Sequence, residues 1–457
     1  MNEFYLGCDA SKGYGDFVIL NSQKQTMVEN FQLDDTFTGH NHLYHQLEMF
    51  LKRHPGSRLS AGIESTGGYE SNWCYALARF GASLNIRVAH INPVGIANDS
   101  KAEQQRNTTD KISARNIAEY MIRHPEKVEY GTENPLISLK RQWGYIALLK
   151  KQLTQLLNHL EILVYTSNPE LLMYCRNGVQ GWILQLLLKY PTARKLASAR
   201  VKTVAKIPFI NEGRAAKLIE RAKTSVASTV DEISSQLLSS TVAQILHLKK
   251  AIQIQTDQLE KECSLREVNL LTSCIGIGKI TALVLMIYIE TIDRFSSSKK
   301  LAAYFGLHPE YRISGDGKKG RFRMSKKGQP EPRKMLYMAC MSAITSNPLI
   351  KELYTRKVEQ GMAKKAAIGV CMHKMIRIVY GMLKNNTPFD AEIDQTNRNN
   401  AKNKTASKTV DKSRRLQSYD SDAPISRRQN AKRMEQRLSQ DGVLPSCAGS
   451  GLAPKTC

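Results

Sequence analysis

The stretch FYLGCDASKGYGDFVIL, residues 4–20, decides the fold of the N-terminal part of this chain. Residues 4–8 and 17–20 are short apolar runs, and the glycines within residues 13–15 favour a turn between them. The pattern predicts an antiparallel hairpin, and it places Asp9 directly after the first strand of that hairpin.

The residues after this hairpin alternate between strand-like and helical patterns. We expect further strands over residues 26–33, 59–63 and 86–91, and helices over residues 42–53 and 72–80. Three hairpin-type strands followed by alternating helix and strand predict an α/β sheet of the ribonuclease-H kind.

The middle of the chain has a purely helical pattern. Two segments carry apolar residues at the spacing of a coiled-coil seam. The first segment contains Ile146, Leu149, Leu153, Leu156, Leu160 and Leu163, and the second contains Leu238, Ile245, Ile252 and Leu259. The two helices could pack on each other as an internal hairpin or on a second subunit, and the spacing favours neither.

Composition changes again towards the C-terminus, where a helix-rich, basic segment is followed by one rich in Asn, Lys, Arg, Ser and Gln. The last segment has few large apolar residues, so we expect a disordered tail there. We therefore predict four parts: an α/β domain over residues 1–125, a helical region over 126–268, a mostly α domain over 269–390 and a basic tail over 391–457.

The 457 residues include 66 Lys and Arg against 41 Asp and Glu, a formal net charge of +25. The excess favours a polyanionic partner, with nucleic acid first and an acidic membrane surface second; a merely solvated basic surface is the alternative. We expect no membrane span, because the longest apolar run, residues 282–289, is far shorter than the roughly 20 residues required. The N-terminus lacks the pattern of a signal peptide.

Cysteine usage is the last compositional signal. The nine cysteines are scattered and form no CxxC pair, so both a zinc site and a disulfide framework are disfavoured. We expect reduced, mostly structural thiols in a cytoplasm.

Three acids stand where strands end or a helix begins. Asp9 follows the first strand, Glu64 follows the strand over 59–63, and Asp110 precedes a helical segment over 112–122. Carboxylates from distant segments can together hold hard divalent cations such as Mg²⁺, and two such ions suit phosphodiester chemistry. Each acid alone is equally well explained by capping, so the prediction depends on the three together.

A serine lies within a strongly basic loop further along the chain. The sequence LAAYFGLHPEYRISGDGKKGRFRMSKKG, residues 301–328, contains Ser314 and Gly315. A serine nucleophile needs a polarised hydroxyl and cations that offset charge on the phosphoryl oxygens, and glycine lets the backbone approach DNA. Cations that could serve are Lys318, Lys319, Arg321, Arg323, Lys326, Lys327 and Arg333. On chemistry alone, a loop that only grips phosphate explains these residues better than a nucleophile does.

A glycine-containing turn opens the same domain. The sequence SCIGIGK, residues 273–279, lies between two helical segments and resembles a helix-hairpin-helix. Backbone N–H groups at such a turn bind phosphate without reading sequence. Gly276, Gly278 and Lys279 are therefore candidate nucleic-acid contacts, and simple helix packing is the alternative.

Several blocks of the sequence resemble those of IS110-type insertion-sequence transposases, relatives of the Piv pilin-gene invertase. The blocks GCDASK, IESTGGYE, INPVGIA and TTDKISARNIAEY occur in that order, at residues 7–12, 63–70, 91–97 and 108–120. A later pattern, AxxGLxPxxxxSG, is met over residues 303–315. The resemblance spans residues 4–390, is poor through the long middle, and gives no counterpart for the tail.

The resemblance implies a RuvC-like domain whose quartet of acids, Asp-Glu-Asp-Asp, binds Mg²⁺, and a separate transposase domain with a serine nucleophile. Asp9, Glu64 and Asp110 match the first three acids. Ser314 matches the serine, and Ser325 is the fallback. The family resemblance also implies double-stranded DNA substrates, namely element ends and targets, a structured noncoding bridge RNA as guide, and assembly as a dimer or tetramer.

The chain departs from the family pattern at the fourth acid. Ser113 stands where the family has a carboxylate, about one helical turn after Asp110. A neutral hydroxyl should weaken metal binding, although three acids and water can still hold Mg²⁺. Asp99 is a possible substitute that nothing in the sequence places nearby.

Two other hypotheses stay open. A metal-only nuclease or junction resolvase would cleave DNA without forming a covalent protein–DNA species. A nucleic-acid-binding protein whose site has decayed at Ser113 would bind RNA and DNA in a salt-sensitive way without breaking strands.

Overall fold

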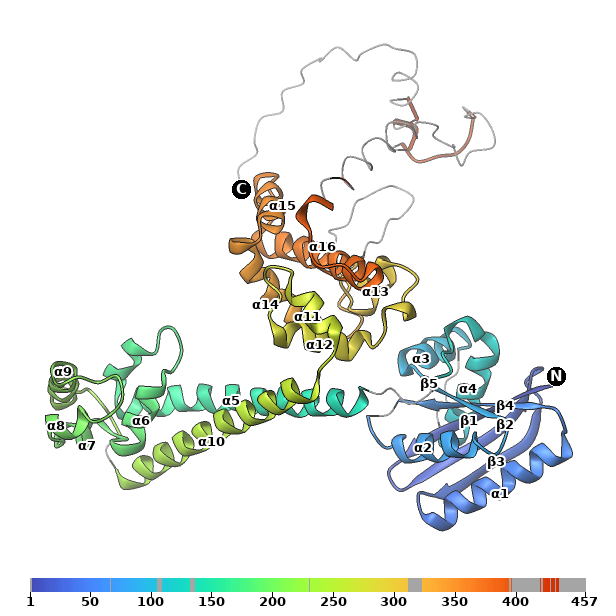
Figure 1. The fold of residues 1–457 in the computed structure, drawn as a ribbon, viewed down its shortest axis with the longest axis horizontal. Coiled ribbons are helices and arrows are strands. Elements are labelled where there is room, and N and C mark those ends of the chain that lie inside the picture. The colour runs from blue at the N-terminus through green and yellow to red at the C-terminus, as the bar shows by residue number, and fades with distance from the viewer. Residues whose placement is uncertain are drawn as a thin grey trace. The chain divides into compact units, whose positions relative to one another are not determined.

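The structure is a computed structural model that describes residues 2–65, 67–104, 109–131, 136–229, 231–310, 323–393, 396, 420, 422–427, 429–431 and 433–434. The chain divides into two compact units, Met1–Pro135 and Leu136–Cys457, and each is described by itself (Figure 1). The finer division of the second unit at residues 268 and 390 stays a prediction.

The first unit is built on a five-stranded mixed sheet with the order β3-β2-β1-β4-β5. Its strands are β1 (Glu3–Ser11), β2 (Tyr14–Asn21), β3 (Thr26–Asp34), β4 (Arg58–Glu64) and β5 (Ile86–Ile91). The first three strands are antiparallel, whereas β4 pairs in parallel with both β1 and β5. The hairpin and the α/β sheet of the ribonuclease-H, RuvC-like kind predicted from the sequence are confirmed.

Helices cover both faces of this sheet because side chains alternate along each strand. The helices α1 (Phe37–Arg53) and α2 (Ser71–Phe80) pack on the face that carries Cys8, Phe17 and Ile63. On the other face lie α3 (Pro93–Ala102) and α4 (Asp110–Arg123), and Figure 1 shows the layers. Helix α4 begins at Asp110, two residues earlier than the predicted start, because the Thr109 side chain caps it by accepting from the Ile112 N–H.

In the second unit, the two long helices pack on each other. Helix α5 (Ile137–Ser167) lies along α10 (Glu232–Glu262), and Ile146, Leu160 and Ile245 are completely or almost completely buried. The predicted seams are therefore used at least in part within one chain. Packing of these helices on a second subunit stays a prediction.

One end of this helix pair carries a small helical group with its own apolar core, which includes Leu160 of α5 and Leu238 of α10. The group consists of the 3₁₀ helix η2 (Pro169–Tyr174) and helices α6 (Gly181–Lys189), α7 (Ala193–Ala197), α8 (Val201–Val204) and α9 (Glu212–Lys223).

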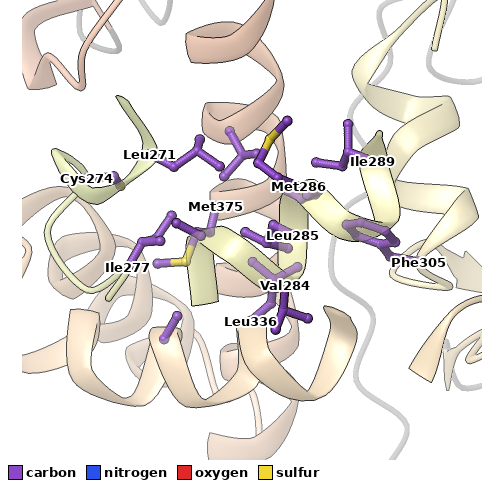
Figure 2. Close-up of a cluster of buried hydrophobic side chains, with 14 of the residues drawn as sticks. Leu271, Cys274, Ile277, Val284, Leu285, Met286, Ile289, Phe305, Leu336 and Met375 are labelled. Atoms are coloured by element: carbon purple, nitrogen blue, oxygen red, sulfur yellow. The ribbon is translucent and has the colours of Figure 1, made fainter. Parts of the chain in front are cut away.

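A second core joins the other ends of α5 and α10 to the C-terminal helices (Figure 2). Its centre is α12, in which Val284 and Leu285 are completely buried. The elements are α11 (Arg266–Thr272), α12 (Lys279–Ile289), η3 (Ile292–Arg294), α13 (Ser298–Tyr304), β6 (Pro309–Glu310), β7 (Arg323–Met324), α14 (Pro330–Ser346), α15 (Pro348–Glu359) and α16 (Lys364–Asn385). A third 3₁₀ helix, η1 (Pro125–Lys127), belongs to the first unit.

Within the described residues, α16 alone is long and apolar enough to cross a membrane by length and composition. The sequence analysis had expected no such stretch. Half of its apolar window is buried, and Cys371, Met375 and Val379 belong to the core in Figure 2, so α16 has the burial of a core helix.

Candidate active site

Two of the predicted acids lie side by side at the edge of the sheet. In the parallel pair of β1 and β4, Gly7 is the register partner of Gly62 and Cys8 the partner of Ile63. Asp9 and Glu64 are the next residues along the two strands, so the register places the two carboxylates next to each other. Both are on the face covered by α4, because Cys8 and Ile63 point to the opposite face.

The two glycines let α4 approach this face closely. A Cβ on Gly7 would lie 2.0 Å from the backbone oxygen of Ala114 in α4. A Cβ on Gly62 would lie 2.2 Å from the Met121 sulfur of the same helix. With no side chain at either position, the helix can lie against β1 and β4, and its first turn reaches Asp9 and Glu64. Asp9 was predicted to follow the first strand directly, but pairing with β2 extends β1 to Ser11, so Asp9 lies within the strand.

The first turn of α4 supplies the remaining predicted residues. The Ser113 side chain is hydrogen-bonded to Asp9, and the negative charge of Asp110 acts on the same carboxylate. The Tyr14 hydroxyl donates to Asp110 Oδ2 at 3.0 Å, which fixes Asp110 from the hairpin. The structure therefore brings Asp110 and Ser113 to Asp9 and sets Glu64 beside Asp9, and the role of these residues as metal ligands stays a prediction.

Burial, together with neighbouring like charges, makes these carboxylates harder to ionise. Burial, followed by the charges of Asp110 and Asp16, raises the pKa of Asp9 to about 6, and the hydrogen bond with Ser113 partly offsets this. Burial and the charge of Asp9 raise the pKa of Glu64. Among the described residues, no Lys or Arg contributes to either shift. Negative charge therefore accumulates here without a basic side chain to balance it.

Asp16 is a residue of this site that the sequence analysis missed. It is the register partner of Asp9 in the hairpin, so the two side chains share one face. Asp16 is only 4% exposed, and its Oδ2 accepts a hydrogen bond from Gln32 Nε2 at 3.0 Å. Asp16 could have been found from the predicted hairpin, because pairing of the two strands places Asp16 opposite Asp9.

The donor set fits a hard divalent cation, since it consists of carboxylate and hydroxyl oxygens with an uncompensated negative charge. Within the described residues, however, no three Asp, Glu, His or Cys side chains are close enough to enclose an ion. Asp99, the suggested substitute for the fourth acid, is engaged elsewhere, in ion pairs with Arg123 at 3.0 Å and His124 at 3.2 Å.

Ser314, Gly315, Lys318, Lys319 and Arg321 lie outside the described residues. The two ends of their loop are described: β6 pairs with β7, with Pro309 opposite Met324. Arg323 lies in β7, and the fallback Ser325 follows that strand, donating its backbone N–H to His308 at 3.0 Å.

Arg333 holds the turn that follows β7 rather than projecting freely. Its Nη1 donates to the backbone oxygens of Phe305 at 3.0 Å and Lys326 at 3.1 Å, and burial lowers its pKa. Gly328 has φ +146°, and a Cβ there would lie 2.3 Å from the Tyr304 oxygen. The sequence RMSKKG thus forms a fixed turn, and Lys327, which pairs with Glu310 at 3.1 Å, remains largely exposed on it.

The glycine turn predicted between two helices is present between α11 and α12. Gly276 has φ +105° and packs against α14, where a Cβ would lie 2.6 Å from the Cβ of Ala343. Gly278 is the N-cap of α12, and Lys279 pairs with Glu260 at 3.0 Å. The turn therefore satisfies the helix-packing explanation, and phosphate binding at it stays a prediction.

Family models match both ends of the chain. Residues 6–169 match the DEDD-type IS110 model, described as "Transposase", and residues 268–355 match the model described as "Transposase IS116/IS110/IS902 family". The first match contains the four carboxylate-site residues predicted from the sequence, and the second contains Ser314.

Individual proteins are also similar to this chain. The pilin gene-inverting protein of Moraxella lacunata is 25% identical over 398 residues, which is 86% of this chain and 100% of that protein. A protein of insertion element IS110 from Streptomyces coelicolor is 24% identical over 165 residues, 36% of this chain and 40% of its own. A solved T. thermophilus RuvC in complex with a Holliday junction substrate aligns at 9% identity and a TM-score of 0.23, covering 28% of this chain and 99% of that one.

Proposed function

Because the chain belongs to the IS110-type transposases, which makes it a DNA recombinase, we propose that it exchanges DNA strands with two sets of residues: the acids Asp9, Glu64 and Asp110, and the serine nucleophile Ser314. The observation that carries the proposal is the closeness of Asp9 to Glu64, Asp110 and Ser113 under helix α4.

The acids would hold a divalent ion, with Mg²⁺ as our choice. When bound, the ion would polarise a phosphodiester oxygen and offset negative charge. The chain's own contribution is to fix the acids in advance. Tyr14 orients Asp110 and Ser113 orients Asp9. The pKa of Asp9 is raised first by burial and then by neighbouring negative charge, and a cation would relieve both effects.

Asp16 is the carboxylate that we place in the role of the missing fourth acid. It stands opposite Asp9, it is almost fully buried, and its charge already acts on Asp9. Ser113 offers only a neutral hydroxyl, so a second carboxylate on the same face would restore the charge that the family pattern supplies from α4.

Ser314 would attack a backbone phosphorus. The bond from its Oγ to phosphorus forms while the bond to the leaving deoxyribose oxygen breaks. The hydroxyl proton passes to a base, and the leaving oxygen takes up a proton. Lys318, Lys319, Arg321, Arg323, Lys326 and Lys327 would neutralise the phosphate, and Arg333 would hold the turn that carries the last of them.

Substrate choice and assembly belong to the same proposal. The substrates would be double-stranded element ends and targets, selected by a structured noncoding bridge RNA, and the working form would be a homo-oligomer. The excess of basic residues supports contact with both nucleic acids. A metal-only nuclease is the second candidate function, favoured by the observation that Asp9, Asp110 and Ser113 meet within one compact unit.

The acids are tested by metal-dependent cleavage of element-end DNA. Asp9→Asn, Glu64→Gln, Asp110→Asn and Asp16→Asn are compared with Glu29→Gln, a change at an exposed acid on edge strand β3. The proposal expects each of the first four variants to lose at least about tenfold in cleavage rate. Full activity in Asp9→Asn would overturn it, and full activity in Asp16→Asn alone would remove only the assignment of the fourth acid.

A further inference from the structure

The glycine turn before α12 has a counterpart in the helical group at the end of the long helix pair. The segment VAKIPFIN, residues 204–211, joins α8 to α9, just as LTSCIGIG, residues 271–278, joins α11 to α12. It lies outside both matched family models. The two segments differ in sequence, and the second contains two glycines where the first contains none.

The hydrogen bonds of the two turns correspond one by one. In the first turn the Ile207 N–H donates to the Val204 oxygen at 3.1 Å, and the Ile210 N–H donates to the Ile207 oxygen at 3.1 Å. In the second turn, Cys274 donates to Leu271 at 3.1 Å and Ile277 to Cys274 at 2.9 Å.

The backbone conformations correspond as well. Phe209, with φ +67°, occupies the position of Gly276, with φ +105°. Asn211 and Gly278 are the N-caps of the next helices, with ψ 169° and 166°. A turn of the same build therefore occurs twice in the chain.

The backbone conformation of Phe209 is energetically unfavourable, and its side chain buries almost no surface. A non-glycine residue with positive φ is strained, and an aromatic one especially so. Its side chain is 85% exposed, so packing within the chain does not offset this strain. The Arg214 guanidinium holds the turn in place by donating to the Phe209 oxygen at 3.2 Å while lying over the Trp182 ring at 4.1 Å. An exposed aromatic on a strained, braced turn is typical of a contact surface.

The surface around this turn is basic. Residues 200–217 contain Arg200, Lys202, Lys206, Arg214 and Lys217 against one acid, Glu212. Lys202, Lys206 and Lys217 are exposed, and none of the ion pairs between described residues involves them. Free cations on both helices beside the turn are complementary to a run of phosphates.

We propose that residues 200–217 form a second contact surface for double-stranded DNA, in which Lys202, Lys206 and Lys217 bind backbone phosphates and the Phe209 ring packs against the sugar and base edges of a groove. Duplex DNA is the chosen partner because the family to which the chain belongs acts on DNA, and because the three lysines offer contacts to backbone phosphates, which do not depend on base sequence. Of the proposed function, this inference requires only that the chain belongs to that family. It requires neither a bound metal nor Ser314 as nucleophile.

The test measures binding without cleavage. The full chain, in EDTA, is titrated into a fluorescent DNA duplex at several salt concentrations, and Lys202→Gln/Lys206→Gln is compared with Lys189→Gln/Lys223→Gln. The control pair removes the same charge from the C-terminal ends of α6 and α9, away from the turn. For the first pair we expect about tenfold weaker binding. The salt slope, which is the slope of the logarithm of the binding constant against the logarithm of the salt concentration, should become flatter by about 2, and the control should change little.

Phe209→Asn separates contact from folding, since asparagine tolerates positive φ. We expect an unchanged or raised unfolding midpoint together with weaker DNA binding. Equal losses in both lysine pairs, or no loss in the first pair, would overturn the proposal. So would a loss confined to an RNA duplex of the same length. If the wild type shows no cleavage with Mg²⁺ but its DNA binding still depends on Lys202 and Lys206, the serine and metal assignments fail and this surface stands.

Discussion

Gly7 and Gly62 are register partners on the parallel strands β1 and β4, and both lie beneath helix α4. Two residues beyond each glycine, on the same face, stand Asp9 and Glu64. The two glycines allow helix α4 to lie against the sheet. They therefore also determine how closely the first turn of α4 approaches the two acids.

Gly7→Ala tests this link. The new methyl group would meet the Ala114 backbone oxygen at 2.0 Å, so the helix or the strand must move. We expect a loss of about 1–3 kcal/mol in the free energy of unfolding, measured by urea denaturation. Gly144→Ala in α5 is the matched control, because nothing lies within 4 Å of its Cβ and alanine favours helix. Equal stability of Gly7→Ala and the wild type would contradict the packing argument.

Asp9→Asn should change how stability depends on pH when metal is absent. The folded-state pKa of Asp9 is raised from 3.8 to about 6, so the unfolded state releases this proton at lower pH. The stability gained from the protonated form is complete below about pH 4 and is lost as the pH rises through about 6. Melting curves in EDTA should therefore show Asp9→Asn gaining on the wild type as the pH rises from about 4 to about 6, with little further change above that range. A gap that stays constant across that range would refute the assignment.

Ser113→Asp restores the acid that the family carries. A further carboxylate beside Asp9 increases repulsion, so the metal-free protein should melt at a lower temperature at pH 7.5. Divalent metal should then stabilise the variant more strongly than the wild type, with a lower midpoint in a Mn²⁺ titration followed by melting temperature. Ser113→Ala is the control, since it removes the hydroxyl without adding charge. Identical titrations for Ser113→Asp and wild type would mean that position 113 does not reach the ion.

Arg333→Lys should separate turn geometry from charge. Lysine keeps the positive charge but cannot reproduce the planar guanidinium that holds the Phe305 and Lys326 oxygens together. We expect strand exchange to fall at least about tenfold while the salt slope of DNA binding stays unchanged. Lys327→Gln, at an exposed lysine on the same turn, should instead flatten the slope by about 1. A flatter slope for Arg333→Lys would show that its side chain contacts phosphate directly.

Much of the first unit could be predicted because its signals are local. The pattern of residues 4–20 predicts their hairpin, and Glu64 stands at the end of its strand as expected. Asp9 was expected at a strand end as well but lies within β1. Asp16 was missed because its importance arises from pairing with Asp9 across the turn. The role of Gly62 depends on a helix more than fifty residues away, which spacing does not reveal.

The repeated turn was missed for a different reason. Residues 204–211 lack the glycines by which such turns are recognised, and Phe209 adopts a conformation that its residue type disfavours. The apolar spacing predicted a packing seam on each long helix, but it did not show which helix each seam packs against. Packing within one chain emerges only when the ends of α5 and α10 share cores with the surrounding short helices.

The most direct test of the central claim is a denaturing gel that detects a covalent protein–DNA adduct. The reaction contains element-end DNA, its guide RNA and Mg²⁺, with wild type, Ser314→Ala and the matched control Ser325→Ala. We predict an adduct for the wild type and for Ser325→Ala, and none for Ser314→Ala. Cleavage without any adduct, or an adduct that survives in Ser314→Ala, would contradict the account, and the former would indicate a metal-only nuclease.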